Sequence, residues 1–351
     1  MFFGKKQSLI GLDIGSHTVK VAELESHPKH GHKLVNWGIS APLAEAIVDG
    51  EIMDRQLVVD AISNLVESRG ISTRNVVAAV SGRAVIVKKI TMNKLSSEDA
   101  QQAVYWEAEQ HVPYDINDVS LDFEILGPAP NDPKQMQVLL VAAKKDMVLA
   151  FGDLMREAGL QPLVVDVDSF AAQNALEANY HFGAEEVVAT LNVGSEITNI
   201  NITQAGVPYF TKDLQVGGSG FVEAVQRKFS LSQAEANAAV RGESGVSDDI
   251  VPIIEQACEG LATALERAQA YLRTAGEAGA ITRVMLCGGG AMTPGLSEFL
   301  NRRFGVPAEI ANPLARVQYD PALFAGHDVN RVAPLLTVGI GLALRRVGDK
   351  S

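Results

Sequence analysis

The sequence contains two copies of one short pattern, half a chain apart, and this repeat limits the folds available to it. The segment LDIGSHTVKVAEL occupies residues 12–24, and LNVGSEITNINIT occupies residues 191–203. Each copy reads as an apolar strand, a polar turn with glycine, and a second strand of alternating character. Two related hairpins at this separation predict two related α/β domains that face each other.

Composition and charge exclude several classes of protein. The chain has 351 residues, of which 47% are hydrophobic and 21% are charged, as expected for a soluble globular protein with room for two cores. A formal net charge of −12 argues against a nucleic-acid partner, because binding to phosphates needs clustered Lys and Arg. Two cysteines, Cys258 and Cys287, are too few for a disulfide framework or a four-cysteine zinc site.

The apolar stretches of the sequence favour a cytoplasmic protein. The opening MFFGKKQSLIGLDIG lacks the long apolar core and the cleavage site of a signal peptide. No later stretch approaches the roughly 20 apolar residues that a membrane-spanning helix needs. We therefore expect the chain to be cytoplasmic.

Between the two hairpins, the pattern predicts a domain that carries an insertion. A helix capped by Asp54 and a buried strand, NVVAAV, continue the first domain. A unit of different character, with three strands and two helices, follows over about residues 83–160 and reads as a small α+β subdomain. The strand PLVVDV and a helix capped by Asp168 or Ser169 then return the chain to the first domain.

We divide the chain into a first domain over residues 1–185 and a second over residues 186–351. In the second, a mainly helical region over about residues 212–280 follows the hairpin. A strand, ITRVMLC, then runs into the glycine turn GGGAM and a helix. The last element, PLLTVGIGLALRR, is predicted to be an apolar helix.

The glycine turns are candidate phosphate sites. A triphosphate needs backbone N–H groups that point inward with no side chains in the way, and turns with glycine supply them. Both hairpin turns lead from strand to strand, which disfavours a P-loop, and no GxxxxGK[ST] motif occurs. GGGAM lies near the C-terminus and does not complete the GxGxxG spacing of a Rossmann fold. The ordered set of two hairpins and a third glycine turn is more specific than any one turn.

This ordered set resembles the superfamily of actin, Hsp70 and the sugar kinases, in which two hairpins hold the phosphates and a third glycine turn supports the adenosine. The resemblance implies an α/β, actin-like (ribonuclease H-like) fold of two domains around a cleft for ATP and magnesium, with Asp13 holding the magnesium through water. The nucleotide-binding residues that it implies are Asp13, Gly15, Ser16, His17, Thr18, Asn192, Gly194, Ser195, Gly217, Gly218, Glu235, Gly288, Gly289 and Gly290.

Two further residues near this set have alternative interpretations. By the same resemblance, Asp168 matches the acidic position that orients the attacking water, and it is otherwise a plain helix cap. Lys20 either reaches a phosphate or points outward from its strand, and we favour the outward orientation.

Segments over nearly the whole chain resemble the PilM family of type IV pilus assembly proteins. They are MFFGKKQSLIGLDIGSHTVK, YWEAEQHVPYDINDVSLDFEIL, VGGSGFVEAVQRKFSLSQAEA and VGIGLALRR. The resemblance implies a ferredoxin-like inserted subdomain, shared with the cell-division protein FtsA, and a scaffold at the inner face of the inner membrane. It also implies a partner, the short cytoplasmic N-terminal tail of the membrane protein PilN, bound in a groove beside that subdomain.

For this partner groove the resemblance suggests residues from the segments AVIVKKI and YWEAEQHVPY. The apolar candidates are Val87, Ile90, Tyr105 and Trp106, and each of them is alternatively a core residue. We expect the tail peptide to dock on them.

Two departures from the family pattern bear on activity. Asn192 stands where the family usually has aspartate, and an amide cannot replace the charge that holds a metal or positions water. The family's AExxK pattern reads AEANA here, so that Glu235 is present and Ala238 replaces the lysine. We therefore expect ATP binding that is retained but weaker, with very slow or absent hydrolysis.

Two other functions share this fold. A metabolite kinase would transfer the γ-phosphate to a small molecule, but the sequence offers no convincing set of substrate residues, and Asn192 counts against it. A filament-forming relative of FtsA is the second alternative, but the ending RRVGDKS lacks an amphipathic membrane helix. The scaffold that binds ATP is the favoured interpretation.

Overall fold

The structure is a computed structural model of the chain, and it describes most of the residues. The described ranges are 8–27, 31–43, 45–48, 50–82, 84–129, 132–243, 247–275 and 278–345. The opening MFFGKKQ and the closing RVGDKS, on which two of the expectations above depend, lie outside them. Within these ranges, no helix is both long enough and apolar enough to cross a membrane.

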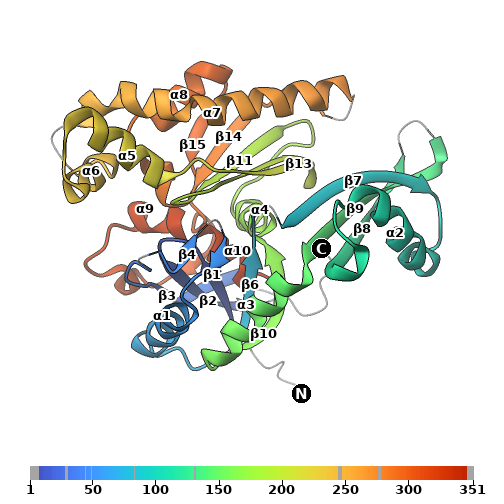
Figure 1. Cartoon of the computed structure of the whole chain (residues 1–351), viewed down its shortest axis with the longest axis horizontal. Helices are drawn as coiled ribbons and strands as arrows, with labels where there is room; N and C mark the ends of the chain where they lie inside the picture. The colour runs from blue at the N-terminus through green and yellow to red at the C-terminus, as the bar shows by residue number, and fades with distance from the viewer. Residues whose placement is uncertain are drawn as a thin grey trace.

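Six strands form the first of two large sheets, in the order β10-β6-β1-β2-β3-β16 (Figure 1). The first predicted hairpin, β1 and β2, continues into β3 as an antiparallel meander, whereas β6 and β10 extend the sheet in parallel from β1. The bounds are β1 Ser8–Ile14, β2 Val19–His27, β3 Gly31–Ile39, β6 Asn75–Val80, β10 Gln161–Val167 and β16 Gln318–Tyr319. A small hairpin of β4 (Ile47–Val48) and β5 (Glu51–Ile52) lies between β3 and the first helix.

Helix α1 (Arg55–Ser68) buries an apolar stripe against this sheet. Its N-terminus is capped as the sequence predicts, because the Leu57 backbone N–H donates to Asp54 Oδ1 at 3.0 Å. The buried positions recur at helical spacing and pack on the side chains of β1, β2 and β6. They are Val58, Val59, Ile62, Leu65 and Val66.

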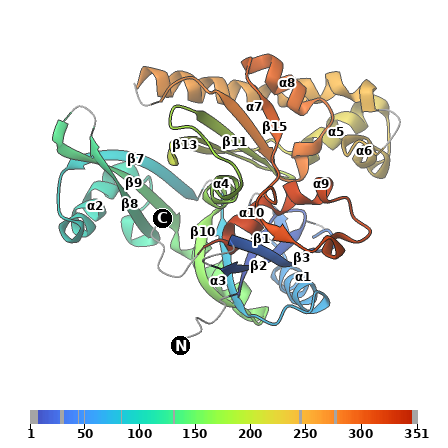
Figure 2. The same cartoon turned by 180° about the vertical axis from the view of Figure 1, so that it is seen from behind.

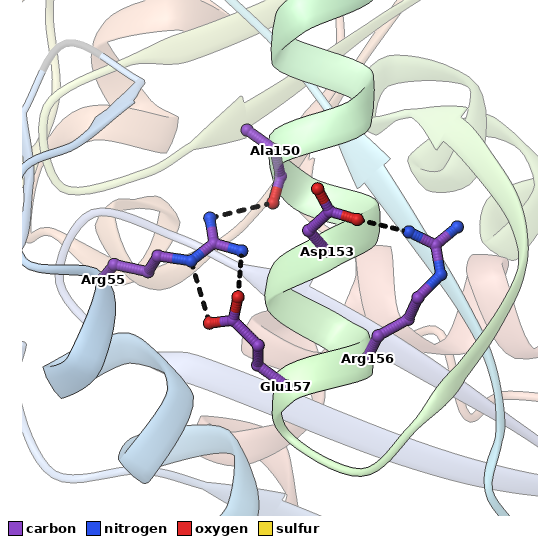
Figure 3. Close-up of polar contacts among 5 residues, drawn as sticks. All are labelled: Arg55, Ala150, Asp153, Arg156 and Glu157. Atoms are coloured by element: carbon purple, nitrogen blue, oxygen red, sulfur yellow. Dashed lines mark hydrogen bonds and ion pairs between the residues drawn. The ribbon is translucent and has the colours of Figure 1, made fainter.

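Helix α3 (Lys145–Glu157) lies beside α1, and a bidentate ion pair connects the two helices (Figure 3). The Arg55 guanidinium donates to both carboxylate oxygens of Glu157, at 2.9 and 2.8 Å, and to the Ala150 carbonyl oxygen at 3.4 Å. The ion pair is exposed, so it orients the helices more than it stabilises them. The buried side chains of α3 join the same core as those of α1, and this burial is the stronger contribution.

The second large sheet has the strand order β13-β12-β11-β14-β15. Its hairpin repeats the register of the first, because Asn192 lies opposite Asn199 as Asp13 lies opposite Lys20. The bounds are β11 Val187–Val193, β12 Thr198–Gln204, β13 Val207–Leu214, β14 Arg283–Cys287 and β15 Ala308–Ile310. The helices that share its largest core are α5 (Gly218–Phe229), α6 (Gln233–Val240), α7 (Ser247–Thr274) and α8 (Leu296–Phe304).

The inserted unit is a three-stranded antiparallel sheet, β7-β9-β8, with helix α2 on one face, and it projects from the body of the molecule (Figure 1). Ser96 caps α2, because its Oγ accepts from the Asp99 backbone N–H at 3.2 Å. The bounds are β7 Val85–Asn93, α2 Ser97–His111, β8 Val119–Ala129 and β9 Asp132–Lys144.

The C-terminal segment returns to the first sheet. β16 pairs with β3, and α10 (Thr337–Ala343) packs between β1 and helix α4 (Asp168–Asn179), which lies between the two sheets (Figure 2). The division after residue 185 assigns this segment to the second domain, although it pairs and packs mainly with the first. The remaining short helices are Ile116–Asp118, Gly289–Met292, Pro321–Phe324, Val329–Val332 (α9) and Ala333–Leu336.

Backbone contacts at glycines allow α10 to fit between its neighbours. A Cβ added to Gly11 in β1 would lie 1.8 Å from the Gly339 carbonyl oxygen, and one added to Gly341 would lie 1.7 Å from the Ala171 carbonyl oxygen. No side chain fits at either distance. Gly11 of β1 and Gly341 of the VGIG segment are therefore the sequence requirement for this packing.

Substituting Gly341 tests this packing. We expect Gly341→Ala to lower the free energy of unfolding by at least about 1–3 kcal/mol, because the methyl group overlaps rigid backbone of α4. Urea denaturation followed by circular dichroism measures the change. The control is Gly220→Ala in α5, where an added Cβ meets nothing within 4 Å, and we expect its stability to be unchanged or slightly raised. Equal stability of Gly341→Ala and the wild type would contradict the contact.

Candidate functional site

The two hairpin turns open into one cleft between the sheets. Each is closed by the same backbone bond, from Gly15 N–H to the Thr18 carbonyl oxygen at 3.2 Å and from Gly194 N–H to the Ile197 carbonyl oxygen at 2.9 Å. Both turns line the inner part of the cleft, together with the third glycine turn. An outer cavity of about 590 Å³ shares several of these residues and extends toward α5 and α6.

Asp13 and Lys20 face the inner cleft as a cross-strand pair. Lys20 Nζ lies 3.2 Å from Asp13 Oδ2, and both side chains are largely buried. The favoured outward orientation of Lys20 is therefore wrong. Directly opposed residues of an antiparallel pair point to the same face, so the register that brings Asp13 into the cleft brings Lys20 there as well.

Asp168 lies in the inner cleft at the start of α4, where β10 ends. The predicted cap is wrong, since Val167 holds the N-cap position and α4 has no side-chain cap bond. The Ser169 hydroxyl is buried and has no hydrogen-bond partner among the described residues. Burial and the nearby Asp13 carboxylate raise the pKa of Asp168 to about 7, although a hydrogen bond from Ser81 opposes the shift. The carboxyl group thus changes protonation near neutral pH, as acid–base chemistry requires.

The second turn belongs to a chain of hydrogen bonds that reaches the first domain. Asn192 Nδ2 donates to Asn199 Oδ1 at 2.9 Å, and Asn199 Nδ2 donates to Asp213 Oδ1 at 2.8 Å. The other oxygen of Asp213 accepts from the Gly82 backbone N–H, between β6 and β7. The Asn192 amide is thus held by Asn199, which lines the same inner cleft.

Gly288 and Gly290 bring the third turn against the second hairpin. A Cβ on Gly288, which has φ +83°, would lie 2.5 Å from the Val193 carbonyl oxygen, and one on Gly290 would lie 2.5 Å from Val193 Cγ1. Gly289 differs, because an added Cβ there would meet no protein atom within 4 Å. The turn therefore packs tightly on one side and leaves open space in the cleft on the other.

Gly217 and Gly218 support the second turn from behind. The Gly218 N–H donates to the Gly194 carbonyl oxygen at 2.9 Å, and the Ser219 N–H donates to the Ser195 carbonyl oxygen at 2.8 Å. A Cβ on Gly217 would lie 2.4 Å from that Ser195 oxygen, so the approach requires glycine. Gly218 also lines the outer cavity, whereas Gly217 lines a small separate cavity behind the turn.

Most of the predicted nucleotide residues surround the cleft, but Gly217, which lines the separate cavity, and Glu235 do not. Those in the inner part are Asp13, Gly15, Ser16, His17, Asn192, Gly194, Ser195, Gly288 and Gly289. Those that line only the outer cavity are Thr18, Gly218 and Gly290. Glu235 lines neither, because its carboxylate accepts from the Ser232 N–H and hydroxyl in a capping box at the start of α6. The cavity instead meets Gln233 and Asn237, since residues four apart share a helix face.

The four predicted partner residues do not form one surface. Ile90 is 4% exposed and belongs to the core between the inserted sheet and α2. Val87 points to the opposite face of that sheet, because residues an odd number of positions apart on a strand point to opposite faces. Tyr105 and Trp106 lie on the exposed side of α2, with Trp106 66% exposed. The prediction of a single groove lined by all four is wrong for this reason.

Several residues reach the cleft from outside the glycine turns and were not predicted from the sequence. They are Ser81, Gln226, Gln233, Asn237, Arg241, Thr293 and Arg331. Gln233 and Asn237 were detectable, because the Ser-x-x-Glu capping box ending at Glu235 directs that glutamate to the helix end. The others depend on contacts between distant segments, which no local pattern indicates.

Two sheets that each present a glycine hairpin turn to a shared cleft define the actin-like fold, and solved structures of that fold match nearly the whole chain. The ethanolamine utilization protein EutJ from Carboxydothermus hydrogenoformans matches 97% of this chain and 91% of its own, with 16% identity and a TM-score of 0.58. MreB5 of Spiroplasma citri bound to ADP matches 95% and 94%, with 12% identity and a TM-score of 0.56. The predicted fold class is confirmed.

Within that fold, the chain belongs to the family of type IV pilus assembly protein PilM, whose family model matches residues 11–347. A solved structure of a PilM–PilN type IV pilus biogenesis complex matches 98% of this chain and 100% of its own, with 29% sequence identity and a TM-score of 0.85. The resemblance drawn from the sequence is confirmed.

The raised pKa of Asp168 makes stability depend on pH in a way that Asp168→Asn removes. Between the pKa near 4 of the unfolded chain and about 7 in the folded protein, the wild type loses stability as pH rises, because ionisation favours the unfolded chain. We expect the unfolding free energy of Asp168→Asn minus that of wild type to increase from pH 5 to pH 7, by on the order of 1 kcal/mol per unit.

Urea denaturation at several pH values measures this difference. Ser81→Ala is the companion variant, and it should move the midpoint of the wild-type profile to higher pH, because it removes the bond that favours the charged form. Parallel pH profiles for wild type and Asp168→Asn would contradict the assignment.

Proposed function

We propose that this protein is an ATP-binding scaffold of the type IV pilus assembly machinery that binds the cytoplasmic N-terminal tail of PilN. The observation that carries the proposal is the shared cleft, in which a turn with Gly15 and a turn with Gly194 oppose each other from separate sheets. Membership in the PilM family and the likeness to a PilM–PilN complex support the pilus role and the partner.

The residues of the inner cleft fit a nucleoside triphosphate with magnesium. Asp13 would hold the metal through water, and Lys20 beside it supplies a cation for a phosphate. The amides of Gly15, Ser16 and His17 would bind phosphates from the first domain, and those of Gly194 and Ser195 from the second. The negative charge of bound ATP would attract the backbone N–H groups of both turns.

The outer cavity fits the nucleoside. Gly289 and Gly290 offer backbone without side chains in the way, and Gln233, Asn237 and Thr293 line the same space with groups that donate and accept hydrogen bonds. Its volume of about 590 Å³ lies within the usual range for ligand sites of a few hundred to a thousand Å³. We therefore place the adenosine there.

Hydrolysis in this cleft is expected to be very slow or absent. Asn192 supplies no charge at the second turn, and its side-chain NH₂ group is engaged by Asn199. Asp168 would be the residue that orients an attacking water, and its pKa of about 7 suits that role, so the expectation of slow hydrolysis rests on the missing charge at position 192. Binding and turnover are thus separable here, as suits a scaffold.

An ATP turnover assay tests the expectation that hydrolysis is very slow or absent. We expect phosphate release by the wild-type protein with ATP and magnesium to stay close to background, and Asn192→Asp to raise it, because the carboxylate restores charge near the metal. Asp13→Ala controls for contaminating ATPases. Robust wild-type turnover that Asn192→Asp fails to increase would count against the assigned role of Asn192.

The PilN tail is proposed to dock on the face of the inserted sheet opposite α2. There an apolar cluster joins that sheet to β10 and α4 of the first domain. Its buried members are Leu139, Val167 and Phe170, and its partly exposed members are Val85, Val87, Leu126 and Val141. Partly exposed apolar side chains that continue a buried cluster suit an extended peptide, because docking extends the core rather than creating a new one.

A substitution on this face tests the docking site. We expect Val87→Asp to weaken binding of a synthetic PilN tail peptide at least about tenfold, because a charge would replace an apolar contact. Fluorescence anisotropy measures the affinity, and Trp106→Ala and Tyr105→Ala on the opposite side of the unit are the matched controls. Weakening by the α2 variants with unchanged binding to Val87→Asp would move the tail to α2 instead.

The proposed partner also sets the proposed location. A cytoplasmic protein that binds the tail of an inner-membrane protein is held at the inner face of that membrane through its partner. The net charge of −12 adds no attraction to anionic lipid, so the partner is the simpler anchor.

A further inference from the structure

Arg241 brings an unpaired positive charge to the outer cavity. It directly follows α6 and lines the cavity together with His17 and Thr18 of the first domain. Arg331 Nη2 donates to the Arg241 carbonyl oxygen at 2.6 Å, which fixes the backbone at this point. Among the described residues, the Arg241 guanidinium has no ion-pair partner.

The neighbouring cations of the cavity are already paired. Lys20 lies 3.2 Å from Asp13, and Arg331 lies 3.2 Å from Glu243. Arg241 is therefore the cation of this cavity that forms no ion pair with a carboxylate of the described chain. It is available to an anion that enters the cavity. Arg241 is exposed, so water solvates its charge until a phosphate that enters the cavity accepts hydrogen bonds from the guanidinium.

The charge of Arg241 acts on the first phosphate turn across the cleft. Burial lowers the pKa of His17, and the positive charges of Arg241 and then Lys20 lower it further. His17 lies within the turn whose amides would hold phosphates. The guanidinium of the second domain and the N–H groups of the first thus face one space.

We propose that Arg241 binds the polyphosphate of a nucleoside di- or triphosphate from the second domain, so that the cleft selects these ligands over AMP and adenosine. The inference rests on the proposed nucleotide function and names the residue that discriminates by phosphate charge. A planar guanidinium suits this role, because it can donate two parallel hydrogen bonds to phosphate oxygens. Gln233 and Asn237, on the same face of α6, are neutral and suit the nucleoside.

Calorimetric titration with ATP, ADP, AMP and adenosine in the presence of magnesium tests the proposal. We expect Arg241→Gln to weaken ATP and ADP binding by on the order of tenfold and to leave adenosine binding unchanged. Arg241→Lys should lie between the two. The matched control is Arg273→Gln at the exposed end of α7, which removes the same charge from the same domain outside the cleft and should bind all four ligands like the wild type.

The outcomes separate this inference from the proposed function. If the wild type binds ATP and Arg241→Gln binds it equally well, or loses adenosine as strongly as ATP, the inference is overturned and the nucleotide function stands. If the wild type binds none of the four ligands, both are overturned. A readout without nucleotide is the pKa of His17 by NMR, which should rise in Arg241→Gln, and an unchanged value would also overturn the inference.

Discussion

The carboxylate of Asp213 connects the two halves of the molecule at the base of the cleft. One oxygen accepts from Asn199 in the second sheet, and the other accepts from the Gly82 backbone N–H, where the first domain passes into the inserted unit. Hydrogen bonds to a charged acceptor are stronger than neutral ones. Lys89 of β7 lies over the ring of Tyr209 of β13 at 3.9 Å and adds a second contact between the inserted sheet and the second domain. These contacts therefore fix the position of the inserted sheet relative to the cleft.

Asn192 takes part in this connection and, unlike the aspartate that is usual in the family, brings no charge to the cleft. Its amide donates to Asn199, which in turn donates to Asp213, so that each donor of the chain has an acceptor. A carboxylate at position 192 could not donate this hydrogen bond and would need a donor from Asn199. The NH₂ group of Asn199 already donates to Asp213, and its side-chain oxygen is the atom that faces position 192. The direction of the hydrogen bonds thus agrees with the amide that this chain carries. This direction is consistent with the proposal that the cleft binds ATP and hydrolyses it very slowly or not at all.

Features that depend on neighbouring residues could be predicted from the sequence, whereas features that depend on contacts between distant segments could not. Both hairpins and the third glycine turn were predictable, because alternation and glycine position are local properties. Lys20 was misplaced because its orientation depends on the register opposite Asp13, although a register could have been drawn for so short a turn. Strand alternation alone separates Val87 from Ile90. Arg241 was not predictable, because its site exists only where α6 meets the first turn across the cleft.

The return of α10 to the first sheet connects the two domains at the base of the cleft. Gly288 of the third turn donates to the Pro334 carbonyl oxygen at 2.9 Å, just before α10, and α10 then contacts β1 and α4 through glycine backbone. Together with the Asp213 bonds, these contacts fix the second domain to the first along one edge. At the outer cavity, Arg331 of the C-terminal segment contacts the Arg241 carbonyl oxygen and Glu243 of the second domain. A ligand that contacts both His17 and Arg241 would add a further connection between the two domains at this point.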